Sequence, residues 1–353
     1  MALTRRGKAI VIVGAVVTVL AVAVGAMAVT GHTGPIRRLA VALHVAKAPP
    51  PTCPLTGKPT KGGKPAPHHP VLAVKVENTP EAYPLAGLDK ADIVYEEVVE
   101  GGITRFAAVF DCSSAPRVGP VRSARTTDPK ILLQFGSRPL LGFSGASGQV
   151  LHLVKQAGVV EMVEGAPAAA FARDDSRLVP HNLFTDTAKL WAAGTRLAKH
   201  DVAPRPVFTY SSTVPSPNRK GRSATIVFSG LATAQWRWQG GRYVRYVDGS
   251  PMKLEDGAMV ATDNVVIQQV KTTQSTLHDV LGYPSPEVSM IGTGKAWVLR
   301  DGKLIQGTWS RGTMRDVTTF TTKSGDPIDL RPGTTYVELA PTGMFNATIA
   351  FNS

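Results

Sequence analysis

A glycine-turned hairpin followed by an arginine-rich segment, residues 92–128, constrains the fold of this chain most. Residues 93–99 and 103–110 are rich in β-branched, aromatic and small apolar side chains, a composition typical of strands. Gly101 and Gly102 stand between the two runs, and paired glycines accept the positive φ of a tight turn without steric cost. The sequence therefore predicts two antiparallel strands joined by a short turn.

Charged residues are unusually dense in and after this hairpin. Carboxylates crowd the first strand and the turn, one arginine follows on the second strand, and further arginines come downstream. This density exceeds what a strand needs for packing and solubility, so we expect the functional site here. The residues concerned are Glu96, Glu97, Glu100, Arg105, Arg117, Arg122 and Arg125.

Several separate motifs along the chain are similar to those of one bacterial family and occur in the same order. They are CPLTGKP (53–59), EGGITRF (100–106), GPVRSAR (119–125), PHNLFT (180–185), WVLRDGKLIQGTWSRG (297–312) and DPIDLRPGTTYVEL (326–339). The chain thereby resembles the YerB-like family, which carries a domain of unknown function, DUF3048. The resemblance implies a membrane-attached or lipoprotein-like extracytoplasmic protein. It implies no activity, because none is established for the family.

Residues 9–29 form a run of 21 uncharged, mostly apolar residues. A helix of that length spans a hydrocarbon core of ~30 Å. Arg5, Arg6 and Lys8 precede the run, so the positive-inside rule places residues 1–8 in the cytoplasm and the rest of the chain outside. A cleaved signal peptide is the alternative, with a small-residue site at 26–28. We favour an uncleaved single-pass anchor, and Cys53 lies too far from it to be a lipidated cysteine.

Residues 30–70 are rich in Pro, Gly and Lys and predict an extended stalk. Two domains are expected after it. Residues 71–205 alternate strands with helices, which predicts an α/β domain with a mixed sheet. Residues 206–353 read as short strands separated by Gly, Asp and Asn turns, which predicts a smaller, β-rich and mainly antiparallel domain.

The two cysteines, Cys53 and Cys112, have no neighbouring Cys with which to form a zinc site. Outside the cytoplasm we expect them to form a disulfide, and two unrelated buried thiols are the alternative.

The formal net charge is +13, of which residues 1–50 contribute six positive charges and no negative ones, which leaves +7 for the rest. This excess favours an anionic partner, although a compositional bias of the genome would produce it too. No nucleic-acid-binding motif is present, so nucleic acid is not the expected partner.

Converging arginines are the chemistry that we expect at the site, because a guanidinium binds phosphate or carboxylate bidentately and keeps its charge. The resemblance adds the family pattern of two arginines four residues apart followed by Pro-His-Asn. An anion-binding cleft and an internal salt-bridge network are equally favoured interpretations. The predicted ligand-binding residues are Arg105, Arg122, Ser123, Arg125, Ser147, Arg173, Arg177, His181 and Asn182.

Ser147 stands before residues with helical spacing. We expect it to cap that helix, whose free N–H groups would help to hold an anion. A serine nucleophile with His181 as its base, and with Asp174, Asp175 or Asp186 to orient the histidine, is the less favoured alternative, because the G-x-S-x-G pattern is incomplete. Glu96, Glu97, Glu100 and Asp128 suit Mg²⁺ or Ca²⁺ as oxygen ligands, but their spacing matches no cation motif. We therefore predict no cofactor, and a divalent cation is the less favoured alternative.

The leading functional hypothesis is the binding of an anionic cell-envelope ligand, a phosphate-bearing glycan or a lipid-linked wall precursor. The first alternative is an enzyme acting on such a polymer, a phosphotransferase or hydrolase with Glu97, Glu100, Asp128 and His181 as catalytic candidates. The second is a protein–protein scaffold at the membrane. The oligomeric state is left open.

Overall fold

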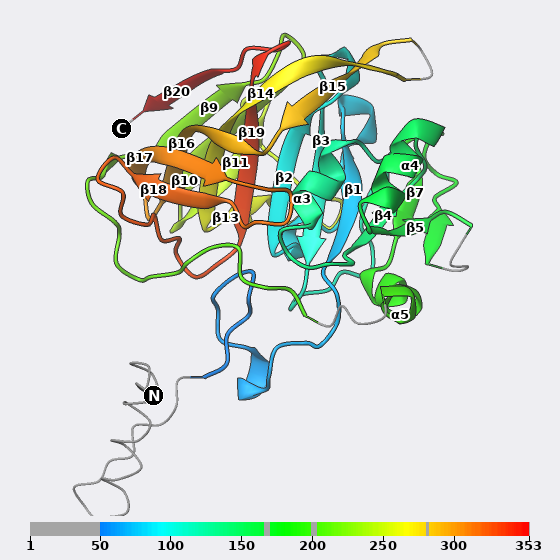
Figure 1. The fold of residues 1–353 in the computed structure, drawn as a ribbon, viewed down its shortest axis with the longest axis horizontal. Coiled ribbons are helices and arrows are strands. Elements are labelled where there is room, and N and C mark those ends of the chain that lie inside the picture. Colours follow the sequence, from blue (N-terminus) through cyan, green and yellow to red (C-terminus); the bar gives the residue numbers. More distant parts are fainter. Residues whose placement is uncertain (1–49, 166–169, 199–202, 280–281, 353) are drawn as a thin grey trace, which may run out of the picture. The chain divides into compact units, whose positions relative to one another are not determined.

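The structure, a computed structural model, describes residues 50–165, 170–198, 203–279 and 282–352, and residues 50–353 form one compact unit (Figure 1). Within these ranges no helix combines the length and the apolar character needed to cross a membrane. The predicted cytoplasmic segment 1–8, the predicted anchor 9–29 and the first part of the predicted stalk lie outside the described residues.

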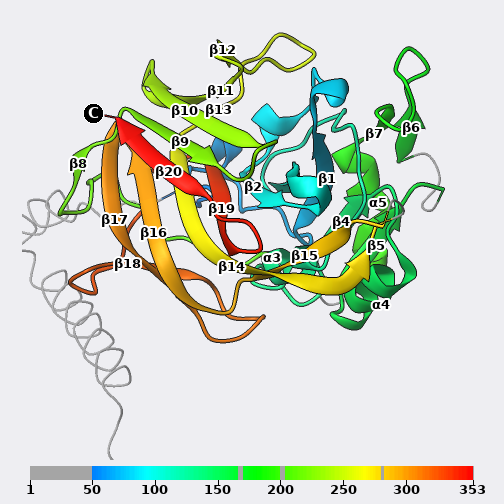
Figure 2. The same cartoon turned by 90° about the horizontal axis from the view of Figure 1, so that it is seen from above.

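A 12-stranded mixed sheet runs through the compact unit (Figures 1 and 2). Its main path is β18 (Thr319–Thr322), β17 (Lys303–Arg311), β16 (Gly292–Arg300), β14 (Asn264–His278), β19 (Thr335–Gly343), β2 (Ile93–Val98), β3 (Thr104–Phe110), β1 (Leu72–Asn78), β4 (Leu140–Phe143) and β5 (Val160–Val163). β15 (Pro284–Ser289) pairs with β14, and β8 (Arg219–Lys220) pairs with β17. The pairs β1–β4, β4–β5, β14–β19 and β19–β2 are parallel, and the other pairs of the sheet are antiparallel.

A second sheet covers one face of the first. It contains six strands: β12 (Ser250–Pro251), β11 (Arg242–Val247), β10 (Thr233–Gln239), β9 (Ser223–Val227), β20 (Thr348–Asn352) and β13 (Ala261–Thr262), which pairs with β11. Trp236 of β10 packs its ring against Tyr336 of β19, with centroids 4.8 Å apart. Trp238 and Tyr243 are cross-strand partners whose rings lie 4.9 Å apart, so these aromatic residues serve the core. A separate hairpin consists of β6 (Phe171–Arg173) and β7 (Leu183–Thr185).

Three α-helices complete the part of the fold that the structure describes. α5 (Thr187–Ala198) packs through Leu190 into the same core as the second sheet. α3 (Thr127–Leu132) and α4 (Gly148–Gln156) pack through Ile131 and Val154 into the core on the other face of the large sheet. The expected mixed sheet with helices is thus confirmed, with few helices and much strand.

The hairpin predicted from the glycine pair is β2–β3, and a short 3-10 turn, Glu100–Gly102, joins its strands. Its two neighbours come from distant parts of the chain. β1 pairs with β3, and β19, from the second predicted domain, pairs in parallel with β2. The segments 71–205 and 206–353 therefore meet inside one sheet.

The predicted disulfide is confirmed. Cys53 and Cys112 are bonded, with their Cα atoms 6.0 Å apart, and tie the segment before β1 to the end of β3. Leu55 is fully buried and its carbonyl oxygen accepts a hydrogen bond of 2.5 Å from the hydroxyl of Tyr210. The described part of the predicted stalk is thus not solvated throughout, because this disulfide and this apolar side chain hold residues 53–60 on the body.

Candidate functional site

A row of charged side chains crosses three neighbouring strands at one end of the hairpin. Arg105 on β3 is the register partner of both Glu77 on β1 and Glu97 on β2. Side chains alternate between the two faces of a sheet, so these three share one face, and Glu96 lies on the other. The acidic run that looked like one cluster in the sequence is therefore divided between two sites.

On the far face, Glu96 belongs to a buried cluster that joins the two sheets. Arg245 Nη1 lies 2.7 Å from Glu96 Oε2 and 3.3 Å from Glu338 Oε1. Trp236 Nε1 donates to the same Glu338 oxygen at 2.7 Å. Burial, together with the neighbouring Glu96, raises the pKa of Glu338 well above its usual range, although Arg245 opposes the shift. This cluster is closed to solvent and is structural.

On the near face, Lys75 is completely buried and binds two of the predicted catalytic carboxylates. Its Nζ is paired with Glu97 Oε1 and lies 2.8 Å from Asp128 Oδ1. Burial raises the pKa of Asp128; Lys75 opposes this shift and Glu97 adds to it. Asp128 Oδ2 also accepts a hydrogen bond from the backbone N–H of Arg125 at 2.6 Å, so the buried Lys75–Glu97–Asp128 group helps to hold the arginine segment in place.

Above this layer lies a cavity of about 520 Å³. Five residues that the sequence predicted as ligand-binding line it: Arg105, Arg122, Ser123, Arg125 and Ser147. Glu100, a predicted catalytic candidate, lines it as well. We call this space the anion cavity.

Backbone hydrogen bonds hold the arginine segment in place. Arg122 N donates to Lys75 O of β1 at 2.9 Å. Ser144 N and Ala124 N then form bonds of 3.0 Å that join this segment to the loop after β4. The segment is thus fixed between the end of β1 and the start of α4, which brings its side chains to the mouth of the cavity.

The buried guanidinium of Arg105 has few partners for its charge and its N–H groups. Its side chain is only 7% exposed, yet no carboxylate of the described residues lies within salt-bridge distance. Nη1 donates to Ser123 O at 3.3 Å, and Nε has no hydrogen-bond partner within the described part of the chain. Burial, together with the nearby cations Arg125 and Arg122, lowers the pKa of Arg105 to about 10.

The other two arginines are partly neutralised. Arg125 binds Glu100 Oε2 through Nε at 2.8 Å and Nη2 at 2.5 Å, and Ser285 Oγ donates to Glu100 Oε1 at 2.5 Å. Burial would raise the pKa of Glu100, but Arg125 and Ser285 outweigh it and hold the pKa below its usual value. Arg122 Nε lies 3.4 Å from Glu77 Oε1 and has no hydrogen bond of good geometry among the described residues.

The N-terminus of α4 forms another wall of the anion cavity. Ser147 is the N-cap, and its hydroxyl accepts from Val150 N at 3.4 Å, as predicted. The N–H groups of Gly148 and Gln149 precede any carbonyl that they could bond within the helix. A helix N-terminus attracts negative charge through these free donors and the helix dipole.

The remaining predicted residues lie elsewhere, so three guanidinium groups converge on this cavity and not the five that the sequence suggested. Arg173 forms a bidentate pair with Glu164 at 2.8 and 2.6 Å, and its Nη1 donates to Asn182 Oδ1 at 2.8 Å. Arg177 donates to the backbone oxygens of Ala82 and Pro84 at 3.0 and 2.6 Å. Sequence spacing gives no information on the direction of these loop side chains.

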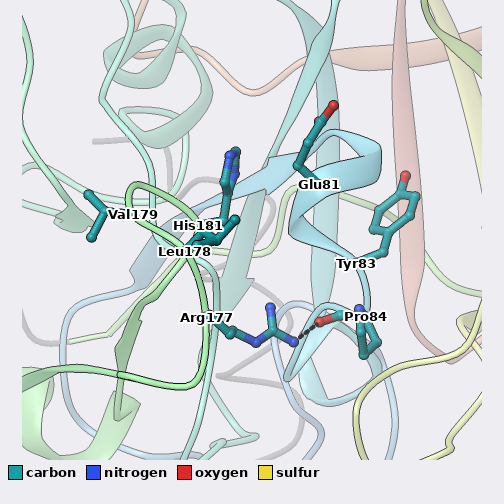
Figure 3. A pocket seen from close by; sticks show the side chains of 7 residues that line it. All are labelled: Glu81, Tyr83, Pro84, Arg177, Leu178, Val179 and His181. Atoms are coloured by element: carbon teal, nitrogen blue, oxygen red, sulfur yellow. Dashed lines mark hydrogen bonds between the residues drawn. The ribbon is translucent and has the colours of Figure 1, made fainter.

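His181 and Arg177 belong to a second cavity, of about 410 Å³ (Figure 3). His181 Nδ1 lies 2.9 Å from Glu77 Oε2, so a carboxylate orients its ring, but Ser147 lines the anion cavity and His181 lines this one. Of the aspartates proposed to orient it, Asp174 pairs with Arg117 at 2.6 Å and Asp186 accepts from Ala188 N at the start of α5. The serine-nucleophile arrangement is therefore not assembled.

Sequence reasoning missed one wall of the anion cavity. His278, Asp279 and Ser285 line it from the β14–β15 hairpin, which reaches toward α4 in both views (Figures 1 and 2). Lys130 of α3 holds this hairpin by donating to Val288 O at 2.8 Å. No local signal marks these residues, since they enter the site only through the pairing of β14 with β19.

The described ranges contain no group of three or more His, Cys, Asp or Glu side chains arranged to hold a metal ion.

Comparisons with known proteins give a consistent result. The DUF3048 N-terminal domain, described as a protein of unknown function, matches residues 55–200, and the DUF3048 C-terminal domain matches residues 224–337. The "Putative lipoprotein YerB" of Bacillus subtilis (strain 168) is 30% identical over 297 residues, covering 82% of this chain and 86% of that protein. The crystal structure of the YerB protein from Bacillus subtilis is similar with a TM-score of 0.69 and 25% identity, over 85% of this chain and 99% of that chain.

Proposed function

The chain belongs to the DUF3048 family, and on that premise we propose that it is a membrane-attached extracytoplasmic protein that binds an anionic, phosphate-bearing ligand of the cell envelope. The name of its lipoprotein relative supports membrane attachment. In this chain the attachment would be the single-pass segment 9–29, with the N-terminus in the cytoplasm, because a cysteine placed for lipidation is lacking in the sequence.

The observation that carries the proposal is the buried, unpaired guanidinium of Arg105. A buried charge is costly unless it is paired, and proteins normally pair it. Here no carboxylate of the described residues lies at ion-pair distance from the guanidinium, although the more distant Glu100 and Glu77 attract it, and the side chain lines a cavity of about 520 Å³. An anion in that cavity would supply the missing partner.

The surroundings of Arg105 favour a phosphate group. Arg122 supplies a second cation and Ser123 a side-chain hydroxyl from the arginine segment. The first N–H groups of α4 supply neutral donors on another side. A tetrahedral, multiply charged oxyanion uses donors from several directions, whereas a planar carboxylate is satisfied by one guanidinium fork. The positive balance of residues 51–353 supports an anionic ligand as well.

Binding is favoured over catalysis because each predicted catalytic group is already engaged. Glu97 and Asp128 are held by Lys75, and Glu100 is held by Arg125. His181 is paired with Glu77 and lines the other cavity. Glu97 and Asp128 are buried and do not line the anion cavity, and the lowered pKa of Glu100, which does line it, makes that carboxylate a weaker base.

Titration calorimetry of the full-length chain with inorganic phosphate tests the proposal. The protein is held in nanodiscs of zwitterionic phosphatidylcholine, and empty nanodiscs give the blank. We expect saturable binding that is weakened at least tenfold by Arg105→Met. The matched control is Arg173→Met, which removes an arginine that is already paired with Glu164 on the surface and should change Kd less than twofold. Absence of binding, or equal binding by the Arg105 variant, would contradict the proposal.

A further inference from the structure

The second cavity combines an apolar surface with polar groups that are already occupied (Figure 3). Tyr83, Pro84, Leu178 and Val179 line it, and the last two are exposed to 84% and 72% of their surface. A single exposed Leu needs no explanation, but here two adjacent aliphatic residues lie on the rim of a cavity next to a charged site.

The turn that carries these residues is held from several sides. His181 N donates to Leu178 O at 2.8 Å, which closes the turn. The guanidinium of Arg177 fastens it to the backbone oxygens of Ala82 and Pro84. An apolar surface that is already fixed loses little conformational entropy when a ligand covers it, so such a surface binds more tightly than a flexible one.

Most polar atoms of this cavity are used within the protein, whereas the carboxylate of Glu81, which also lines it, is exposed to solvent. Tyr83 donates its hydroxyl to Asn78 Oδ1 at 2.6 Å, and His181 Nδ1 is bound to Glu77. Both terminal nitrogens of Arg177 donate to backbone oxygens. A sugar would need free donors and acceptors here, whereas an aliphatic group needs only the apolar surface that remains.

One arginine connects the two cavities. Arg122 lines the anion cavity, and its Nη1 donates at 3.3 Å to the carbonyl oxygen of Pro180, inside the turn of the second cavity. The same guanidinium lies 3.4 Å from Glu77, whose other oxygen is 2.9 Å from His181 Nδ1. A ligand that touches Arg122 with its charged end is thus within reach of Leu178 and Val179.

We propose that the ligand is an amphipathic phosphate monoester, with its phosphate in the anion cavity and its aliphatic body on Tyr83, Pro84, Leu178 and Val179. This inference rests on the proposed function. It selects a lipid-linked phosphate over a phosphate-bearing glycan as the class of ligand.

The experiment compares two monoesters of equal charge, methyl phosphate and hexyl phosphate, by titration calorimetry on the same nanodisc-held full-length chain. Hexyl phosphate should bind at least tenfold more tightly than methyl phosphate to the wild type. The double variant Leu178→Asn, Val179→Asn should reduce this preference to less than threefold and leave the Kd of methyl phosphate unchanged. Leu231→Asn is the matched control, since Leu231 is 74% exposed on a different turn and should keep the full preference.

The outcomes separate the two proposals. Binding of methyl phosphate without a preference for the hexyl ester would overturn the amphipathic ligand and leave the anion cavity standing. A preference that survives in the double variant would place the aliphatic body elsewhere and overturn the inference in the same way. If neither ester binds, the proposed function fails and the inference falls with it.

Discussion

Replacing Arg105 with methionine is expected to stabilise the ligand-free protein while it weakens phosphate binding at least tenfold. Methionine replaces the apolar stem of the arginine side chain and removes the guanidinium, and with it the charge that burial penalises. The lowering of the Arg105 pKa from 12.5 to about 10 corresponds to about 3 kcal/mol, at 1.36 kcal/mol for each unit.

The direction of the pH dependence follows from the lowered pKa. Arg105 holds its proton less tightly in the folded protein than in the unfolded protein. The destabilisation caused by burying its charge is therefore fully present below pH 10. It disappears only as the pH rises from about 10 to 12.5. At neutral pH the variant therefore escapes the whole cost but loses the hydrogen bond to Ser123 O, which leaves a net gain of about 1–2 kcal/mol.

Urea denaturation of the full-length chain at pH 7, with and without phosphate, measures this effect. Phosphate at 100 times the wild-type Kd should stabilise the wild type by about 2.7 kcal/mol and the variant, whose Kd is at least tenfold higher, by about 1.4 kcal/mol or less. Arg245→Met provides the contrast, since Arg245 of β11 in the second sheet packs against the opposite face of the large sheet. Arg245 neutralises Glu96 and Glu338, so its loss leaves buried carboxylates unpaired and should cost about 3–5 kcal/mol. If Arg105→Met lost more than about 1 kcal/mol without phosphate, Arg105 would be a structural residue and the reasoning would be refuted.

Two further predictions concern the segment around the disulfide. Burial and the neighbouring Asp92 raise the pKa of Asp111 to about 7. The free energy of unfolding therefore falls as the pH rises from about 4 to 7, because the unfolded state loses the proton first, and this destabilisation is constant above pH 7. Asp111→Asn should raise the free energy of unfolding by about 2–4 kcal/mol at pH 8 and not at pH 4, and an equal gain at both pH values in urea titrations would contradict the assignment. Replacing Cys53 and Cys112 by serine should lower the free energy of unfolding by about 4 kcal/mol, from the entropy of a loop closed across 59 residues, and urea midpoints of the two proteins at pH 7 check this.

The local part of the site was predictable from the sequence. A glycine pair between two strand-like runs predicts the β2–β3 hairpin, and a serine before helical spacing predicts the cap of α4. Because the arginine segment follows the hairpin directly, the nearness of Arg105, Arg122 and Arg125 could be expected as well. Each of these features depends on residues close together in the sequence.

The faces of the charged residues were not foreseen, although the period of a strand is known. Alternation separates Glu96 from Glu97, but it does not say what covers each face. In the structure Glu96 forms an ion pair with Arg245 of β11, and Glu97 forms one with Lys75 of β1. Arg173 failed to join the site because Glu164 on the neighbouring segment binds it. Each charged residue has several possible partners, and the spacing of the charges in the sequence does not determine which ion pair forms.

The sequence by itself determined the β2–β3 hairpin, the cap of α4 and the cysteine pair, since each follows from chain stereochemistry or from composition. Only the tertiary structure decided that β19 lies beside β2 and that Ser285 binds Glu100 across 185 residues. It also decided that Arg105 is buried with no carboxylate of the described residues at ion-pair distance. The physical reason is that strand pairing and burial depend on the free energy of the whole packed chain, in which many similar local segments compete for the same edges and faces.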